Sequence, residues 1–116
     1  MKTRAKDLGT RLETRIVNTA QKAGLIAERL AEGGAYDKGD IRIYSDRELV
    51  GEVKDRMSLN LPATLEKAIL KSGSRDAFVV WRKMKRTSGA YRVQDGPIVV
   101  AVTLDRYIEL LLREVS

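Results

Sequence analysis

The sequence predicts an α/β domain in which a central mixed β-sheet is flanked by helices, with residues 1–116 forming one domain. Two observations predict this class. Apolar residues recur at helical spacing near both ends of the chain and once in its middle, and short runs rich in β-branched residues lie between these segments. Helices that alternate with strands in this way favour a sheet covered by helices.

The first half of the chain begins with an amphipathic helix, which the apolar spacing predicts from about Asp7 to Ala23, with Gly24 as its C-terminal stop. A short strand is expected from Leu25 to Leu30. The segment from Ala31 to Gly39 holds three glycines and is predicted to be a loop. Such a loop could close over a substrate backbone beside a bound cation, or it could be a plain connector.

The second half predicts one more helix, two strands and a last helix. Asn60 and Pro62 indicate a helix start, and Gly73 indicates its end. The apolar runs 76–81 and 97–102 are continuous, which is typical of strands covered on both faces. Thr103 is the expected cap of the last helix. Its apolar face would consist of Leu104, Tyr107, Ile108, Leu111 and Leu112.

Between residues 39 and 54, two β-branched runs flank a polar turn at residues 45–47, which predicts an antiparallel hairpin. A two-residue turn would mix apolar and charged side chains on one face, whereas a three-residue loop keeps the apolar ones together. With the three-residue loop, Asp40, Glu52 and Lys54 share the opposite face. Neighbouring carboxylates repel each other unless a divalent cation lies between them, and Lys54 could orient a water there. A solvated strand face with ordinary surface charges is the alternative.

A further carboxylate, Glu13, falls at the edge of the apolar stripe of the first helix and is expected to face the protein. Acidic side chains are rarely buried unless they are paired or bound to metal. Glu13 is therefore a candidate third acidic ligand, and a salt bridge to a lysine or arginine is the equally weighted alternative.

The composition limits the chemistry and indicates the partner. The chain has 22 basic and 16 acidic residues, a net charge of +6, and neither cysteine nor histidine. The charge favours an anionic partner, of which nucleic acid is the commonest, and a generic basic small protein is the alternative. Thiolate and imidazole chemistry are excluded, so an enzyme here would use carboxylates, lysines, hydroxyls and an oxygen-bound metal. No apolar run is long enough for a membrane span and the start of the chain is charged, so a cytoplasmic location is expected, or the host cytoplasm for a phage protein.

The strongest local charge bias lies at residues 82–92, with five basic residues and no acidic one. It predicts a phosphate-contacting hairpin with Trp81 and Tyr91 nearby. A solubilising loop beside a core tryptophan is the alternative.

These features resemble a known family. Asp40 followed by Glu52-Val53-Lys54 resembles the motif of PD-(D/E)xK nucleases, with Gly39 where a proline usually precedes the aspartate. The order of the elements is similar, over most of the chain, to archaeal and phage-type Holliday-junction resolvases, although the expected loop holds no serine. The other segments that carry this likeness are Gly9-Thr10-Arg11-Leu12-Glu13, Gly24-Leu25, Gly33-Gly34 and Lys38-Gly39-Asp40-Ile41. The resemblance implies a restriction-endonuclease-like fold, with a catalytic set of Glu13, Asp40, Glu52 and Lys54.

The reaction that the resemblance implies is Mg²⁺-dependent hydrolysis of DNA phosphodiesters at four-way junctions, with Mn²⁺ as a substitute metal. Asp40 and Glu52 would bind the metal, Lys54 would stabilise the transition state, and the Val53 carbonyl and Glu13 would be further ligands, Glu13 directly or through water. The expected DNA contacts are Arg4, Lys6, Arg11, Lys38, Arg56, Arg82, Lys83, Lys85, Arg86 and Arg92. A nuclease of the same fold acting on flaps or ends, and a non-catalytic nucleic-acid-binding domain, are the alternatives.

Paired cuts across a junction with approximate two-fold symmetry need two active sites, so a homodimer is expected. The apolar residues of the C-terminal part would supply the interface, unless all of them fill the core. These residues are Ile98, Val100, Tyr107, Leu111 and Leu112.

Overall fold

The computed structural model describes residues 5–30, 38–89 and 91–115, with side chains described from residue 11 onward. Most of the predicted glycine-rich loop, including Gly33 and Gly34, lies outside the described residues. The elements in chain order are α1 (Ala5–Lys22), β1 (Ile26–Arg29), β2 (Ile41–Tyr44), β3 (Glu48–Arg56), α2 (Leu61–Ser72), β4 (Phe78–Arg86), β5 (Arg92–Gln94), β6 (Val99–Ala101) and α3 (Leu104–Glu114).

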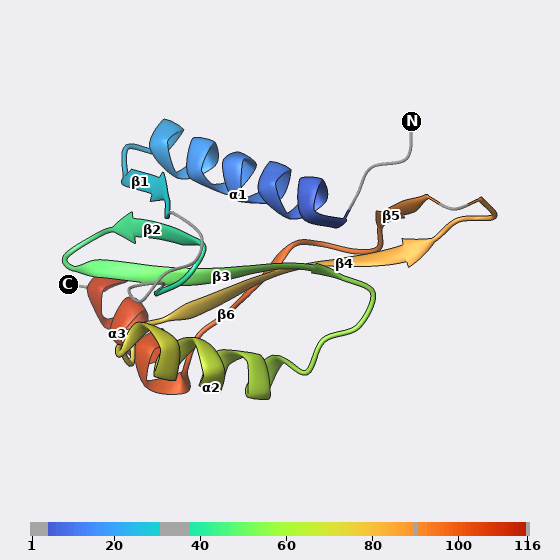
Figure 1. Cartoon of the computed structure of the whole chain (residues 1–116). Coiled ribbons are helices and arrows are strands. Elements are labelled where there is room, and N and C mark those ends of the chain that lie inside the picture. Colours follow the sequence, from blue (N-terminus) through green and yellow to red (C-terminus); the bar gives the residue numbers. More distant parts are fainter. Residues whose placement is uncertain (1–4, 31–37, 90, 116) are drawn as a thin grey trace.

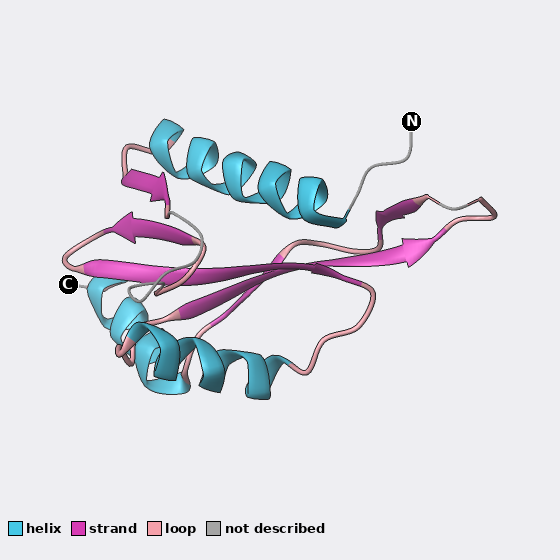
Figure 2. Cartoon of the chain, in the orientation of Figure 1, coloured by secondary structure: helices cyan, strands magenta, loops and turns pink. Residues whose placement is uncertain are grey.

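The architecture is a mixed sheet between two helical layers, which confirms the predicted α/β class. α1 covers one face of the sheet, and α2 and α3 lie on the side of the other face (Figure 1). The strands run in the order β1-β2-β3-β4-β5, and β6 also pairs with β4 (Figure 2). β3 and β4 are parallel, and the other pairs are antiparallel. The helix α2 is the crossover that a parallel pair requires.

The hairpin of β2 and β3 has the register that the burial pattern predicts. Tyr44 pairs with Glu48 and Ile41 pairs with Gly51, so the loop between the strands has three residues, Ser45–Arg47. Ile41 and Val53 are both buried in the core that α1 covers. The three-residue loop is therefore confirmed, together with the face that it assigns to the charged residues.

Two hydrophobic clusters lie on the two faces of the sheet. The cluster beneath α1 contains Leu12, Val17, Ala20, Ala27, Ile41, Val53, Phe78 and Val80. The smaller cluster beneath α2 contains Ala68, Ala77 and Val79. Gly51 matters to the first cluster because the Phe78 ring lies directly over it. A Cβ at position 51 would lie 2.3 Å from a carbon of that ring.

The α2 helix has the ends that the sequence predicts. The Asn60 side chain accepts a hydrogen bond from the amide of Ala63, and Gly73 ends the helix in the left-handed conformation at φ +70°. Glycine adopts that conformation without the steric penalty of a Cβ atom. The predicted α2 is therefore confirmed at both ends.

Two expectations about the C-terminal part are wrong. β6 is not covered on both faces, since Val99 is 37% and Val100 is 62% exposed. β4 is longer than the apolar run, because the basic segment continues the strand to Arg86 and returns as β5. Among the described helices, none has the length and apolar character to cross a membrane.

Candidate functional site

Two carboxylates, Asp40 and Glu52, meet where β2 begins, beside the neighbouring strand β3. The amide of Asp40 donates to the carbonyl of Gly51 at 2.9 Å, and the amide of Val53 donates to Asp40 Oδ2 at 2.8 Å. The neighbouring pairing of Ile41 with Gly51 brings Asp40 opposite Glu52. Gly39 permits this approach because a Cβ there would lie 2.5 Å from Cγ1 of Val50. A glycine at position 39 thus has a packing reason.

The environment of Glu52 disfavours its charge. Burial raises the pKa of Glu52, and the negative charge of Asp40 and a hydrogen bond with its carboxyl raise it further. Lys71 on α2 opposes these effects, with its Nζ 3.1 Å from Glu52 Oε1. The side chain of Glu52 is 10% exposed and that of Lys71 is 39% exposed. A cation at this place is therefore favourable, and Lys71 supplies part of that positive charge.

Lys54 lies two residues after Glu52 and lines the same cavity between β3 and α2. The cavity has a volume of about 270 Å³. It is lined by Glu52, Lys54, Arg56, Thr64, Lys67, Ala68 and Lys71. Four of these residues are cations and one is a carboxylate, so the cavity favours an anionic ligand everywhere except at Glu52.

A second cavity of about 580 Å³ continues along α2 toward its N-terminus. It is lined by Arg56, Ser58, Leu59, Asn60, Ala63, Thr64 and Lys67. Because Arg56, Thr64 and Lys67 line both cavities, the two form one basic groove that ends at Glu52. We refer to the two cavities together as the α2 groove.

The basic segment predicted at residues 82–92 is a projecting hairpin of β4 and β5 (Figure 1). Its basic side chains differ in how firmly they are paired within the protein. Arg82 makes two contacts with Asp55, at 3.1 and 2.5 Å, and that aspartate side chain is only 3% exposed. Lys83 pairs with Asp95 at 3.3 Å on the surface, a kind of pair that exchanges easily with other anions. Arg82 is therefore paired within the protein, and its contact with DNA stays a prediction.

The remaining basic residues of this hairpin are exposed. They are Lys85, Arg86 and Arg92. Strand alternation puts Lys83 and Lys85 on the face of β4 that carries Val79, which packs beneath α2. The exposed lysines and the α2 groove thus lie on a common face. The indole of Trp81 lies on this face as well and donates to the carbonyl of Arg56 at 2.9 Å.

Glu13 is buried, as its position on α1 predicts, with 6% exposure. It neighbours Leu12 in the layer that covers the Val53 side of the sheet, whereas Glu52 faces α2. The structure does not bring Glu13 together with Asp40 and Glu52. Within the described ranges, no three acidic, histidine or cysteine side chains are grouped so that they could hold a metal.

Four of the predicted DNA contacts lie in the first 38 residues of the chain. Arg4 and the side chain of Lys6 lie outside the described residues, whereas Arg11 and Lys38 are exposed. Lys67 and Lys71 were not predicted, although their spacing was a usable signal. Residues 64, 67 and 71 recur at helical spacing, so a groove along α2 would collect them on one face.

Comparisons with family models, with curated proteins and with solved structures found no match. The site is therefore interpreted from its own geometry.

Proposed function

We propose that this protein is a metal-dependent nuclease of the restriction-endonuclease-like fold that hydrolyses DNA phosphodiesters, with four-way junctions as its substrate. One observation carries the proposal: Glu52, which adjoins Asp40, lies at the end of a groove whose other charged lining residues are all cations. Cations attract a phosphate backbone, but a carboxylate pair repels it. The carboxylate pair attracts a phosphate group only when a divalent cation is bound to the two carboxylates.

The carboxylate pair fits Mg²⁺ in its chemistry. Mg²⁺ is commonly held by one or two carboxylates and completes its shell with water and substrate phosphate. Asp40 and Glu52 offer such hard oxygen ligands, and the mutual repulsion that raises the pKa of Glu52 would be relieved by a divalent cation. A bound metal of this kind supplies Lewis acidity and an acidic water. Glu13 has no part in the proposal, because α1 lies on the other side of the sheet.

The other residues of the groove have distinct roles in this proposal. Lys54 neighbours the carboxylates and would stabilise negative charge that develops on the phosphate oxygens. Arg56 and Lys67 would bind flanking phosphates along the groove, since both line the two cavities. Lys85 would extend this path onto the projecting hairpin.

The test incubates the protein with four-way junction, flap, linear duplex and single-stranded DNA, with Mg²⁺, with Mn²⁺ and with chelator. We expect metal-dependent cleavage of the junction that Asp40→Asn or Glu52→Gln abolishes, while binding persists or tightens because repulsion of phosphate falls. Glu48→Gln is the matched control. It removes a carboxylate from the same strand and the same face, at its exposed end. Full cleavage by Asp40→Asn or Glu52→Gln would overturn the assignment of the site.

A non-catalytic nucleic-acid-binding domain is the second candidate. The observation that favours it is that Lys71 already pairs with Glu52 at 3.1 Å, within a groove in which cations predominate. Salt-dependent binding of DNA without hydrolysis in either metal would support this candidate. Cleavage of flaps or ends but not of junctions would keep the nuclease and change its substrate.

A further inference from the structure

Trp81, the single tryptophan of the chain, lies in β4 on the face of the sheet beneath α2. Val79, two residues before it, is buried in the cluster beneath that helix. Because side chains on one face of a strand recur every two residues, Trp81 is the next one on this face, about 7 Å farther along β4. The indole is partly exposed, and it belongs to neither of the two hydrophobic clusters that the described residues form.

The cover that α2 gives to the sheet ends before Trp81. Val79 pairs with Ala101 of β6, and both residues belong to the cluster beneath α2 or pack against it. In the next row on the same face, Trp81 pairs with Val99, which is 37% exposed. Two neighbouring apolar side chains thus remain partly open to solvent where the helix no longer covers the strands.

The neighbours of Trp81 on its other sides are basic. Trp81 lies opposite Lys54 of β3, and Lys83 follows it on the same face of β4. The indole nitrogen donates to the carbonyl of Arg56 at 2.9 Å, which holds one edge of the ring against the end of β3. Lys54 and Arg56 line the α2 groove. The indole therefore adjoins this groove and lies among cations that are proposed to contact phosphate.

The distance between Trp81 and the carboxylates suits one nucleotide. Val79 pairs with Glu52, so Trp81 lies one row beyond Glu52, about 7 Å along the strands. A phosphate beside the carboxylates would carry its own base or the next one within reach of the indole. Grooves that bind single strands combine cations along the backbone with aromatic side chains on which bases stack.

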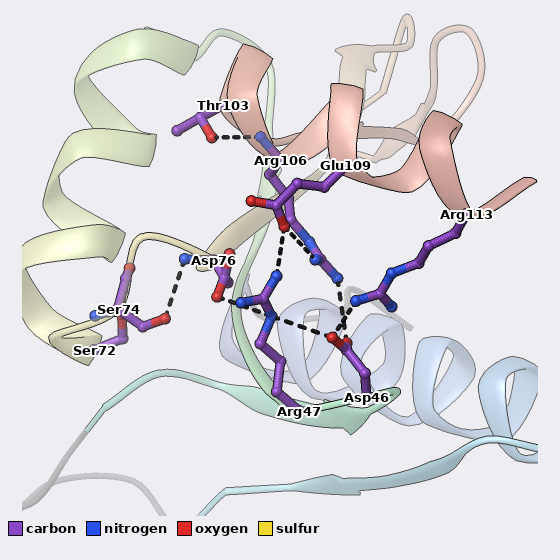
Figure 3. Close-up of polar contacts among 9 residues, drawn as sticks. All are labelled: Asp46, Arg47, Ser72, Ser74, Asp76, Thr103, Arg106, Glu109 and Arg113. Carbon is purple, nitrogen blue, oxygen red and sulfur yellow. Dashed lines mark hydrogen bonds and ion pairs between the residues drawn. The ribbon is translucent and has the colours of Figure 1, made fainter. Parts of the chain in front are cut away.

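The arginines around α3 do not form a comparable surface. Arg106 is 3% exposed and lies 3.1 Å from Glu109 and 3.9 Å from Asp46. Arg47, in the loop between β2 and β3, pairs with Glu109 at 2.5 Å, and Arg113 also pairs with Asp46 (Figure 3). Each of these cations already faces a carboxylate within the protein.

The opposite side of α3 is an apolar stripe that points outward. The exposed fractions of its side chains run from 39% for Leu111 to 82% for Val115. The stripe consists of Leu104, Tyr107, Ile108, Leu111, Leu112 and Val115. It contains no cation, so it does not combine an aromatic ring with phosphate contacts as the Trp81 region does. The dimer interface that the sequence predicts includes three of these residues and stays a prediction.

We propose that the indole of Trp81 is a platform on which an unpaired base stacks when a DNA strand lies in the α2 groove. The inference rests on the proposed function and deepens it, because it names a feature of the substrate: an unpaired nucleotide next to the phosphate at the carboxylates. Stacking tolerates any base, since every base has a π face. The platform therefore favours unpaired DNA over duplex without selecting a sequence.

The experiment compares two short single strands of equal length at low salt with a chelator, so that neither metal nor hydrolysis takes part. One strand is oligothymidylate, and the other has the same phosphates but an abasic site in place of every base. Tryptophan fluorescence reports on this one position, and the anisotropy of an end label gives the affinity. We expect the wild type to bind the thymidine strand on the order of 10-fold more tightly, with quenching by that strand alone.

The variants separate stacking from a purely structural role. Trp81→Leu should bind both strands equally, because leucine is apolar but has no π face. Trp81→Phe keeps an aromatic ring without the indole donor and should retain most of the preference for bases. Tyr107→Leu is the matched control and should keep the full preference, because it removes a 52% exposed aromatic side chain from α3. Thermal denaturation checks that each variant is folded.

Equal affinity of the wild type for the two strands would overturn the platform without any variant. A folded Trp81→Leu protein that still prefers the thymidine strand would also overturn it. Quenching of the same size by a blunt duplex would contradict the requirement for an unpaired base. Hydrolysis is tested separately: stacking without cleavage in Mg²⁺ or Mn²⁺ would keep the platform and refute the nuclease, whereas cleavage without any preference for bases would do the reverse.

Discussion

Removing Lys71 should destabilise the protein in a way that depends on pH. Lys71→Met keeps the length and helix propensity of the side chain but leaves the buried Glu52 beside Asp40 without its ammonium partner. A broken, fully buried pair costs several kcal/mol, but Lys71 is 39% exposed and solvent screens part of the effect. We therefore expect a loss of about 1 kcal/mol at neutral pH, which lowers the Tm by about 4 °C for a domain of this size.

The sign of the pH dependence follows from the raised pKa of Glu52. In the unfolded chain the carboxyl titrates near 4.5, and the folded pKa is higher. Folded protein therefore holds the proton more tightly, and stability falls as pH rises from 4.5 through the folded pKa. Loss of Lys71 raises that folded pKa further, so the difference between variant and wild type is small below pH 4.5 and grows above it.

Thermal denaturation of both proteins across this pH range measures the effect. Lys67→Met is the matched control, because Lys67 lines the same cavity one turn earlier on α2 but is not the partner of Glu52. Added Mg²⁺ should raise the Tm of Lys71→Met more than that of the wild type, because binding stabilises the folded state and the ammonium no longer competes. An equal Tm loss at low and neutral pH, or an equal effect of Lys67→Met, would refute the reasoning.

Three further outcomes are expected. Gly51→Ala should cost about 1–3 kcal/mol, because its Cβ would overlap the Phe78 ring, and a Tm equal to that of the wild type would contradict this packing. Arg113 lowers the pKa of Asp46 to about 2, so the stability that Asp46 contributes is present above pH 3.8 and lost as pH falls toward 2. The Tm difference between Asp46→Asn and the wild type should shrink over that window, and a constant difference would argue against the pair. Lys85→Gln should reduce the salt slope of DNA binding by about 0.9 if this lysine contacts one phosphate, and an unchanged slope would place the DNA elsewhere.

The β2–β3 hairpin could be predicted from the sequence because its pattern of apolar and charged residues fits only one register. Side chains alternate along a strand, so one register buries Ile41 and Val53 together and the neighbouring register does not. Asp40 and Glu52 follow from that register without any knowledge of the rest of the fold. The caps of α2 were predictable for a similar reason, since Asn60 and Gly73 act on backbone groups within a few residues.

Helical periodicity did not predict which distant segments each helix face contacts. It correctly predicted that Glu13 is buried and that α3 has an apolar stripe. It could not show that α1 and α2 lie on opposite faces of the sheet, which separates Glu13 from Glu52. Nor could it show that Arg106 would turn α3 toward an aspartate at position 46, sixty residues earlier in the chain.

The strand register, the turn and the helix caps of this chain could thus be predicted from residue types and spacing, because they depend on residues that are near one another in the sequence. The partner of Glu52, the availability of Arg82 and the outward stripe of α3 depend on distant segments. Lys71 and Asp55 reach their partners only after β3, α2 and β4 have packed. An ion pair between distant segments leaves no periodic trace in either of them, and for that reason only the tertiary structure reveals it.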